Sequence, residues 1–548
     1  MIGMYKSRII AWAAVAMLAC GVAAGAEPGS DAQAVEELRN TLISVMEALV
    51  QKGVLSREQA QQIVAEAQAK GAAAARARAD QAAQEKDAVR VTYVPDNIKA
   101  EIGHQVAGEL QPKVVREVLS EARGQGWGVP GALPEWIKSL SIYGDVRMRA
   151  EDANYGSDNA QFSYLNFDAV NQAGGIGKTG TAALLNTTVD RSRLLGRLRL
   201  GLTANLGGAF SADLRLASGV GRSVGSTNQT LGAYGARGGV NVDKAALNWD
   251  HISPGITREF LVQTGRFDNP YVTTSELVWD KDLTFEGIAA TYAVDLAHRN
   301  ATRVDHNLFL TVGASPIQEI ELSRHDKWLY GAQLGGELPF GESAMLRLSA
   351  AYFIFSNIAG VRNAPDSTLL DYTAPRYLQK GNTLFDIRNS TTDTTVNLFA
   401  LAADYRLANV NFSLDLPFLA RQRLLLSGEI VRNVGYSATR ILARTGSHVA
   451  PRINGYDMAL TIGSASLRAA RAWRAGIGYR YLQRDAVLDA FTDSDFHLGG
   501  TDAKGYTATF DLGLSRNAWL RARLMSATEI DGPPLAIDVY QLDLTGSF

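Results

Sequence analysis

The chain has 548 residues, of which 46% are hydrophobic, and its 54 Lys and Arg residues nearly balance its 56 Asp and Glu residues. This balance argues against a dedicated nucleic-acid-binding protein, which needs a basic surface. The mean hydropathy of −0.07 argues against both a disordered chain and a polytopic helical membrane protein. The single cysteine, Cys20, excludes a disulfide scaffold and a cysteine-based zinc site.

Residues 1–26 have the features of a secretory signal peptide. Lys6 and Arg8 precede a short apolar run, and Ala24-Gly25-Ala26 supplies the small residues of a cleavage site. The alternative is a lipoprotein signal with Cys20 as the acylated residue, but the residues before it fit that pattern poorly. No run of 18 or more apolar residues follows, so we expect export from a bacterial cytoplasm without a transmembrane helix.

Residues 27–123 are predicted to form helices with a short coiled-coil seam, and residues 124–140 a Gly/Pro linker. The seam consists of apolar residues at spacings of three and four: Val35, Leu38, Leu42, Val45 and Leu49. Two interpretations remain open. The segment is either a periplasmic oligomerisation stalk or cell-wall spacer, or a loosely ordered helical leader with no partner. Both remain open because so few heptads do not specify an oligomer alone.

From residue 141 onward, apolar and polar residues alternate with the period of two that is typical of β-strands. In the first such segment, one face consists of Ile142, Gly144, Val146, Met148 and Ala150. The segments run about ten residues or more, which is long enough to cross a bilayer, and short connections alternate with long ones. We therefore predict an all-β, closed, antiparallel transmembrane barrel over residues 141–548, with about 16 strands in a range of 14 to 18 and both barrel ends in the periplasm.

Three segments are specific enough to compare with a known family. They are GRFDNPYVTTSELVWDKDLTFEGIA from Gly265, IYGDVRMR at 142–149 and VDKAALNWD at 242–250. These segments resemble the putative-porin family of Gram-negative outer membranes, and the similarity extends over the whole chain. The resemblance implies a barrel channel but no particular substrate, and no binding residue is transferred from it.

The last predicted strand has a pattern typical of the signal that the barrel-assembly machinery reads. Its apolar face ends in an aromatic residue at the C-terminus: Tyr540, Leu542, Leu544, Gly546 and Phe548. We therefore expect the assembly machinery, outer-membrane lipid and lipopolysaccharide to be partners of the chain.

Strand parity predicts which side chains face lipid and which line the pore. The predicted lipid-facing residues are Leu198, Leu200, Phe510, Leu512 and Leu544. The predicted pore-lining residues are Arg147, Arg149, Arg193, Arg197, Arg199, Arg215, Arg521 and Arg523, together with Asp145, Asp213, Glu429, Asp511 and Asp543. These charges either neutralise one another in pairs or form a transverse field that biases the pore towards anions.

The connection at 267–282 is a candidate constriction loop, because many porins fold a loop inward at this place. Its acidic residues are Asp268, Glu276, Asp280 and Asp282. Tyr271 and Trp279 could pack this loop against the wall. The alternative is an ordinary exposed acidic loop.

Signatures of enzymes and metal sites are weak in this sequence. The seven histidines form no motif such as HExxH. Asp493, Asp495 and His497 alternate in an outer loop and could hold a divalent cation, but we expect a solvated loop instead. We therefore predict no catalytic residue, no metal and no cofactor.

The sequence thus predicts an outer-membrane porin with its N-terminal segment in the periplasm. Small hydrophilic solutes would diffuse passively through it, with a bias towards anions. The first alternative is a structural or tethering barrel in which the helical stalk is the functional part. The second is an outer-membrane barrel enzyme.

Overall fold

The computed structural model describes residues 139–219, 224–252, 258–294, 308–321, 323–340, 343–419 and 422–548. The predicted signal peptide (1–26), the helical segment (27–123) and the linker up to residue 138 lie outside the described residues. The first strand, β1 (Leu140–Tyr155), begins within one residue of the position expected from the alternation.

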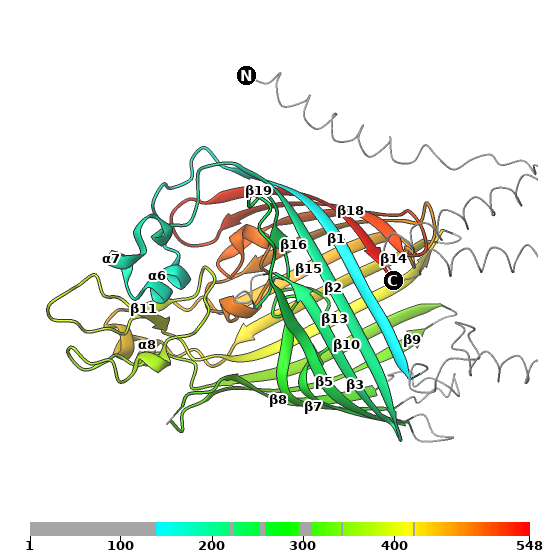
Figure 1. The fold of residues 1–548 in the computed structure, drawn as a ribbon, viewed down its shortest axis with the longest axis horizontal. Coiled ribbons are helices and arrows are strands. Elements are labelled where there is room, and N and C mark those ends of the chain that lie inside the picture. Colours follow the sequence, from blue (N-terminus) through cyan, green and yellow to red (C-terminus); the bar gives the residue numbers. More distant parts are fainter. Residues whose placement is uncertain are drawn as a thin grey trace, which may run out of the picture. The chain divides into compact units, whose positions relative to one another are not determined.

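Within the described residues, one antiparallel sheet of 17 strands closes into a barrel (Figure 1). β4 (Gln229–Thr230) is a two-residue strand beside β2, so the other 16 strands form the wall. The first eight of these are β1, β2 (Arg191–Gly207), β3 (Phe210–Ser218), β5 (Val240–Ile252), β6 (Arg258–Asp268), β7 (Thr284–Val294), β8 (Leu308–Gln318) and β9 (Lys327–Phe340). The second eight are β10 (Ala344–Ser356), β13 (Arg406–Phe418), β14 (Gln422–Asn433), β15 (Asn454–Ser464), β16 (Trp473–Leu482), β17 (Ala503–Gly513), β18 (Ala518–Glu529) and β19 (Ala536–Ser547). The predicted barrel of about 16 strands is confirmed.

β1 closes the barrel, because it pairs with β2 on one side and with β19 on the other. In this register Asp145 lies opposite Arg199 of β2 and opposite Ser547 of β19. Closure pairs the backbone groups of every wall strand on both sides. A barrel in a bilayer needs this arrangement, since no water is present in hydrocarbon to satisfy a free strand edge.

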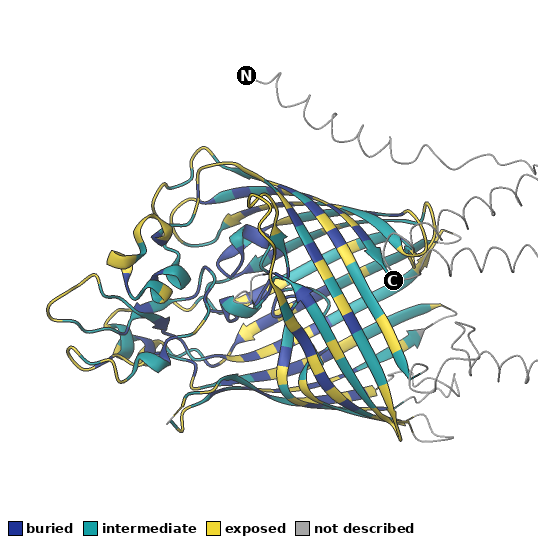
Figure 2. Ribbon diagram, in the orientation of Figure 1, coloured by how far each residue is buried: buried dark blue, intermediate teal, exposed yellow. Residues whose placement is uncertain are grey.

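The two faces of the wall differ in character, and Figure 2 shows the alternation of exposed and buried residues along the strands. Leu198, Leu200, Phe510 and Leu544 are between 45% and 48% exposed and lie on the outer face. Arg197, the direct neighbour of Leu198, is 8% exposed and lies on the inner face. An apolar outer face is the arrangement that a surrounding lipid bilayer favours.

The two ends of the barrel carry different connections. Tight turns such as 208–209 close the short-turn end. The long-loop end carries the loops that we call L1 (156–190), L2 (219–239), L3 (269–283), L5 (357–405), L6 (434–453) and L7 (483–502). These loops contain α6 (Phe167–Ala173), α7 (Ile176–Thr179), η1 (Gly180–Ala183), η2 (Asp371–Thr373), β11 (Leu384–Asp386), β12 (Phe399–Leu401), α8 (Ala438–Thr445), η3 (Asp489–Phe491) and η4 (Phe496–Leu498). In the part of the chain that the structure describes, no helix has the length and apolar character needed to cross a bilayer.

An apolar core joins L3, L5 and L7 to the inner face of the wall. Leu277 and Trp279 of L3, Ile387 and Tyr405 of L5, and Phe353 of β10 are all almost completely buried in it. Burial of large apolar side chains stabilises folded loops in the same way as it stabilises domains. L3 and L7 are therefore packed against the inside of the wall.

Candidate functional site

Most of the predicted arginines of the inner face are ion-paired with acids of neighbouring strands. Asp145 accepts hydrogen bonds from Arg197 and Arg199, at 2.7 Å each. Further pairs between adjacent wall strands include Arg193–Glu151, Arg149–Asp543, Arg215–Asp243 and Arg521–Asp511, at 2.5 to 2.7 Å. Side chains that lie opposite each other on one face of a sheet are close enough for such pairs.

L3 crosses the interior of the barrel from one side of the wall to the other. Near its end, Asp282 contacts Arg197 (3.2 Å) and Arg199 (3.5 Å) of β2. Near its middle, Ser275 donates to Glu429 of β14 at 2.6 Å. β2 and β14 are seven positions apart in a wall of 16 strands, so L3 spans nearly the full diameter.

Aromatic and polar contacts hold the middle of L3 against the wall. The ring of Tyr271 packs edge-on against Phe353 at 4.9 Å, and Trp279 packs against Phe353 at 5.1 Å. The backbone of Thr274 donates to the Asn411 side chain of β13 at 3.0 Å. The alternative of an ordinary exposed acidic loop does not fit this burial.

The four acids predicted for this loop have different environments. Asp282 faces the arginines of β2, and Glu276 pairs with Lys281 inside the loop at 2.7 Å. Asp280 is buried, and this burial, together with Glu276 and Asp493, raises the pKa of Asp280 well above its ordinary value. Asp268 is not a loop residue, because β6 continues to it.

The carboxylate of Asp268 instead contacts two cations of the wall. They are Arg215 of β3 at 2.6 Å and Lys244 of β5 at 3.2 Å. Lys244 also contacts Asp213 at 3.1 Å. Asp268 is therefore part of the wall at the point where β6 leaves the sheet, and the prediction that it narrows the pore from the loop is wrong.

L7 is the second loop inside the barrel, and its acids contact arginines from three different strands. Asp493 lies 2.8 Å from Arg480 of β16. Asp495 lies 2.8 Å from Arg149 of β1 and 3.3 Å from Arg523 of β18. These carboxylates are desolvated, and a desolvated carboxylate needs such counter-ions. The expectation of a solvated loop at this place is therefore wrong.

L3 and L7 also bind each other directly. The backbone N–H of Asp280 donates to the carbonyl of Phe491 at 2.7 Å, and that of Asp493 donates to the carbonyl of Glu276 at 3.2 Å. The hydroxyl of Thr492 donates to the carbonyl of Leu277 at 2.8 Å. The two loops therefore form one body inside the barrel.

The family comparison agrees with this architecture. Residues 39–548 match the family model described as "Putative porin". The chain belongs to this family. The porin is thus an outer-membrane barrel of the channel type, and its family and fold are those of a channel rather than of an enzyme.

Several solved structures show a distant similarity to this chain. OprB of Pseudomonas putida, in its high-pH structure, is 12% identical with a TM-score of 0.42, and the match covers 75% of this chain and 95% of that chain. The outer-membrane channel DcaP of Acinetobacter baumannii is 12% identical with a TM-score of 0.36, over 75% and 97% of the two chains. OmpT of Vibrio cholerae is 7% identical with a TM-score of 0.37, over 75% and 97%. No curated protein matches the porin.

Among the described residues, the buried cations Arg147, Lys327 and Lys380 have neutral closest partners, which for Lys327 of β9 are the Gln318 side chain at 3.0 Å and the carbonyl of Ala374 at 2.6 Å. Arg147 of β1 donates to the side chain of Asn228 at 2.5 Å, and its distance to Asp543 is 4.0 Å. Lys380 of L5 donates to Nδ1 of His497 at 2.9 Å and to the carbonyl of Thr501 at 3.2 Å. Burial lowers the pKa of Lys380 to about 8.

His497 of L7 is not placed to bind a metal. Its Nδ1 accepts from Lys380, and its Nε2–H donates to the carbonyl of Leu535 at 2.8 Å, so the ring is neutral and both nitrogens are occupied. Burial and the neighbouring ammonium lower the pKa of His497 well below its ordinary value. Among the described residues, no group of three His, Cys, Asp or Glu side chains could hold a metal ion.

The sequence interpretation missed several charged residues of this network. Arg480, Asp243 and Lys244 lie on wall strands, and the same parity that identified Arg197 could have identified Arg480. For Asp493 and Asp495, which the sequence suggested only as possible cation ligands, the pairing with wall arginines had no signal, because a loop has no period from which the direction of a side chain follows.

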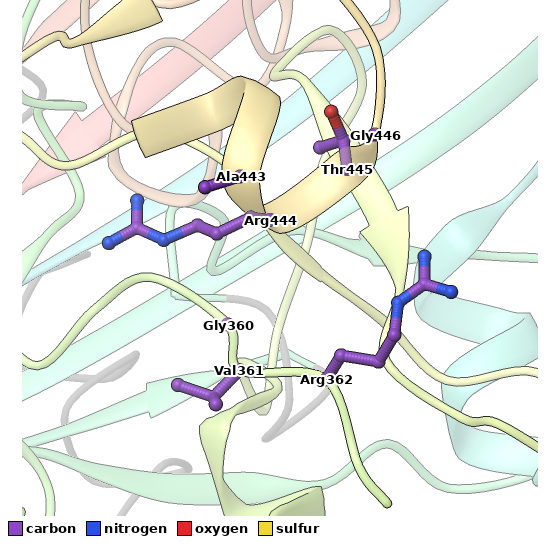
Figure 3. Close-up of a pocket in the computed structure, with 7 residues that line it drawn as sticks. All are labelled: Gly360, Val361, Arg362, Ala443, Arg444, Thr445 and Gly446. Carbon is purple, nitrogen blue, oxygen red and sulfur yellow. The ribbon is translucent and has the colours of Figure 1, made fainter. Parts of the chain in front are cut away.

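Two of the hollows formed by the described residues open at the long-loop end of the porin. The first, of about 500 Å³, lies between 360–362 of L5 and 443–446 of L6 (Figure 3). Its two arginines, Arg362 and Arg444, point in different directions, and Arg444 contacts Asp404 at 3.1 Å. The second hollow, of about 290 Å³, adjoins the ion-pair network and includes Arg193, Lys380 and Asp495.

Proposed function

We propose that this porin is a passive diffusion channel for small hydrophilic solutes. The observation that supports this most directly is the closed barrel, whose outer face is apolar and whose inner face carries charged residues from many strands. A polar lumen is typical of barrels that conduct. L3 and L7 would make the passage narrow, which favours small solutes over large ones.

Single-channel recording tests this function. The purified full chain, added to a planar bilayer in KCl, should produce stepwise increases in current. A tethering barrel with a closed interior would produce none, and neither would a barrel enzyme without a continuous passage. Protein denatured by heat before addition is the control, because its barrel is unfolded.

We further propose that the bias towards anions is modest and does not arise from Arg197 and Arg199. These two guanidinium groups share two carboxylates, those of Asp145 and Asp282, so the cluster of four has no net charge. Arg147 and Lys380, whose closest partners are neutral, are better sources of a positive potential.

Reversal potentials in a salt gradient distinguish these sources of selectivity. Replacing Arg197 and Arg199 by Gln should shift selectivity towards cations, because it leaves two acids uncompensated, and replacing Asp145 and Asp282 by Asn should shift it towards anions. The variant with all four substitutions should retain the wild-type permeability ratio. If that variant loses a wild-type preference for anions, the cluster itself is the source of the bias.

The proposed location is the Gram-negative outer membrane, with the N-terminal segment in the periplasm and a homo-oligomer formed through its helix. The exposed apolar face of β19, with Tyr540, Leu542 and Leu544, and the 59% exposed ring of Phe548 support recognition by the barrel-assembly machinery. The apolar outer face supports contact with lipid and lipopolysaccharide. Removal of Phe548 should lower the yield of folded barrel in outer-membrane fractions.

A further inference from the structure

A cavity of about 290 Å³ lies at the long-loop end of the barrel, next to the ion-pair network. One side of it is β2, with Arg193 and Leu195, and its other sides come from L1, L2, L5 and L7. Its volume is close to the lower limit of small-molecule pockets, about 300 Å³. Five segments that are distant in the sequence thus enclose a space of the size of a small solute.

Two cations line this cavity, and each has capacity for a further partner. Nε and Nη2 of Arg193 both contact the same oxygen of Glu151, at 2.7 and 2.6 Å. None of the described residues accepts a hydrogen bond from its Nη1, and the side chain is 31% exposed. Arg193 can therefore bind a second acceptor without losing Glu151.

Lys380 is the more unusual of the two cations, because it is buried and forms no ion pair with a described carboxylate. Its Nζ contacts only the imidazole of His497 and the carbonyl of Thr501, which leaves one of its three N–H groups free. A buried ammonium group without a counter-ion is costly. The carboxylates of Asp502, Glu529 and Asp489 act on it only from beyond ion-pair distance, so a bound anion would supply a direct counter-ion.

The remaining lining is mixed: it adds neutral polar side chains such as Asn166, Ser226 and Asn228, some apolar surface and no uncompensated acid. Asp495 also lines the cavity, but Arg149 and Arg523 already compensate its carboxylate. Leu195 and the half-buried ring of Phe167 provide the apolar part. The cavity therefore combines positive charge, neutral hydrogen-bonding groups and a smaller aromatic and aliphatic surface.

We propose that this cavity binds a small organic monoanion, with its carboxylate at Arg193 and Lys380 and its apolar part against Phe167 and Leu195. The proposal rests on the proposed function, since it makes the cavity a solute-binding site at the long-loop entrance of the channel. With this site the channel would favour small organic monoanions, whereas a barrel without the site would select solutes only by size.

Benzoate is a suitable probe, with benzyl alcohol as its neutral counterpart. Micromolar to millimolar benzoate should reduce the single-channel current of the wild type in a saturable manner, and benzyl alcohol should not. Arg193→Gln should raise the half-blocking concentration by about tenfold or more, as expected for loss of a hydrogen bond to a charged group. Glu151→Gln should lower it, because Arg193 then has no competing partner.

Arg423→Gln is the matched control. Arg423 also pairs with an acid on a neighbouring strand, Asp415 at 2.8 Å, but it lies on β14 next to the short-turn end. Its substitution should leave the benzoate block unchanged. Equal block by benzyl alcohol, or equal sensitivity of the wild type and Arg193→Gln, would overturn the proposal.

The cavity and the channel can fail independently. Current in KCl without benzoate tests the channel alone. If the wild type conducts no current, titration calorimetry with benzoate on the detergent-solubilised full chain tests whether the cavity binds an anion. Binding that Arg193→Gln weakens supports the site, and the absence of heat with the wild type overturns it.

Discussion

Replacing Asp493 and Asp495 together by Asn should release L7 from the wall and increase single-channel conductance. These two carboxylates compensate Arg480, Arg149 and Arg523, and all five side chains are buried by at least 85%. Removing one partner of a buried ion pair costs about 3–5 kcal/mol. A change of about 3 kcal/mol alters the ratio of docked to undocked loop by more than about a hundredfold.

The substitution changes charge with little change in shape, so the conductance reports on the ion pairs. Asp511→Asn is the matched control, because Asp511 is also buried and pairs with Arg521 at 2.6 Å, yet among the described residues no hydrogen bond or ion pair joins either side chain to L3 or L7. Its conductance should equal that of the wild type. Unchanged conductance in the double variant would mean that the contacts between L3 and L7, rather than the arginines, keep L7 in the barrel.

Phe510→Arg should destabilise the barrel by about 2–4 kcal/mol, the cost of a cationic side chain on the lipid face near the middle of a bilayer. Phe510 is 47% exposed on the outer face of β17. In the membrane, the part of this side chain that is exposed on the isolated chain would contact lipid hydrocarbon. Urea unfolding of the protein in lipid vesicles measures the difference in free energy from the wild type.

Thr509→Arg is the control, because the adjacent residue on the same strand lies on the opposite face. Gly476 lies on the neighbouring strand, and a Cβ atom placed on it would be 2.9 Å from the hydroxyl of Thr509 and 3.0 Å from the hydroxyl of Thr461. Thr509, Gly476 and Thr461 therefore share the inner face of the wall. An arginine there can reach polar groups, and it should cost clearly less than the Phe510 substitution. Equal costs at both positions would contradict the register of β17.

The sequence by itself determined the barrel. Apolar and polar residues alternate along each wall strand. This period of two assigns every side chain to one face of the wall, and no knowledge of the neighbouring strand is needed. Arg197 and Leu198 are adjacent in the chain and lie on opposite faces, as this period requires. The number of strands followed in the same way, because polar connections interrupt the alternation.

Only the tertiary structure decided what occupies the interior. Arg149 and Asp495 are 346 residues apart in the sequence, and no local pattern relates them. Whether a loop folds into the barrel or away from it depends on the sum of its contacts. For L7 these contacts are ion pairs with β1, β16 and β18 and backbone hydrogen bonds with L3. These contacts exist only after the barrel has closed and brought β1 and β18 to either side of β19. The arginines could therefore be assigned to the inner face from sequence, whereas their role as anchors for an acidic loop could not.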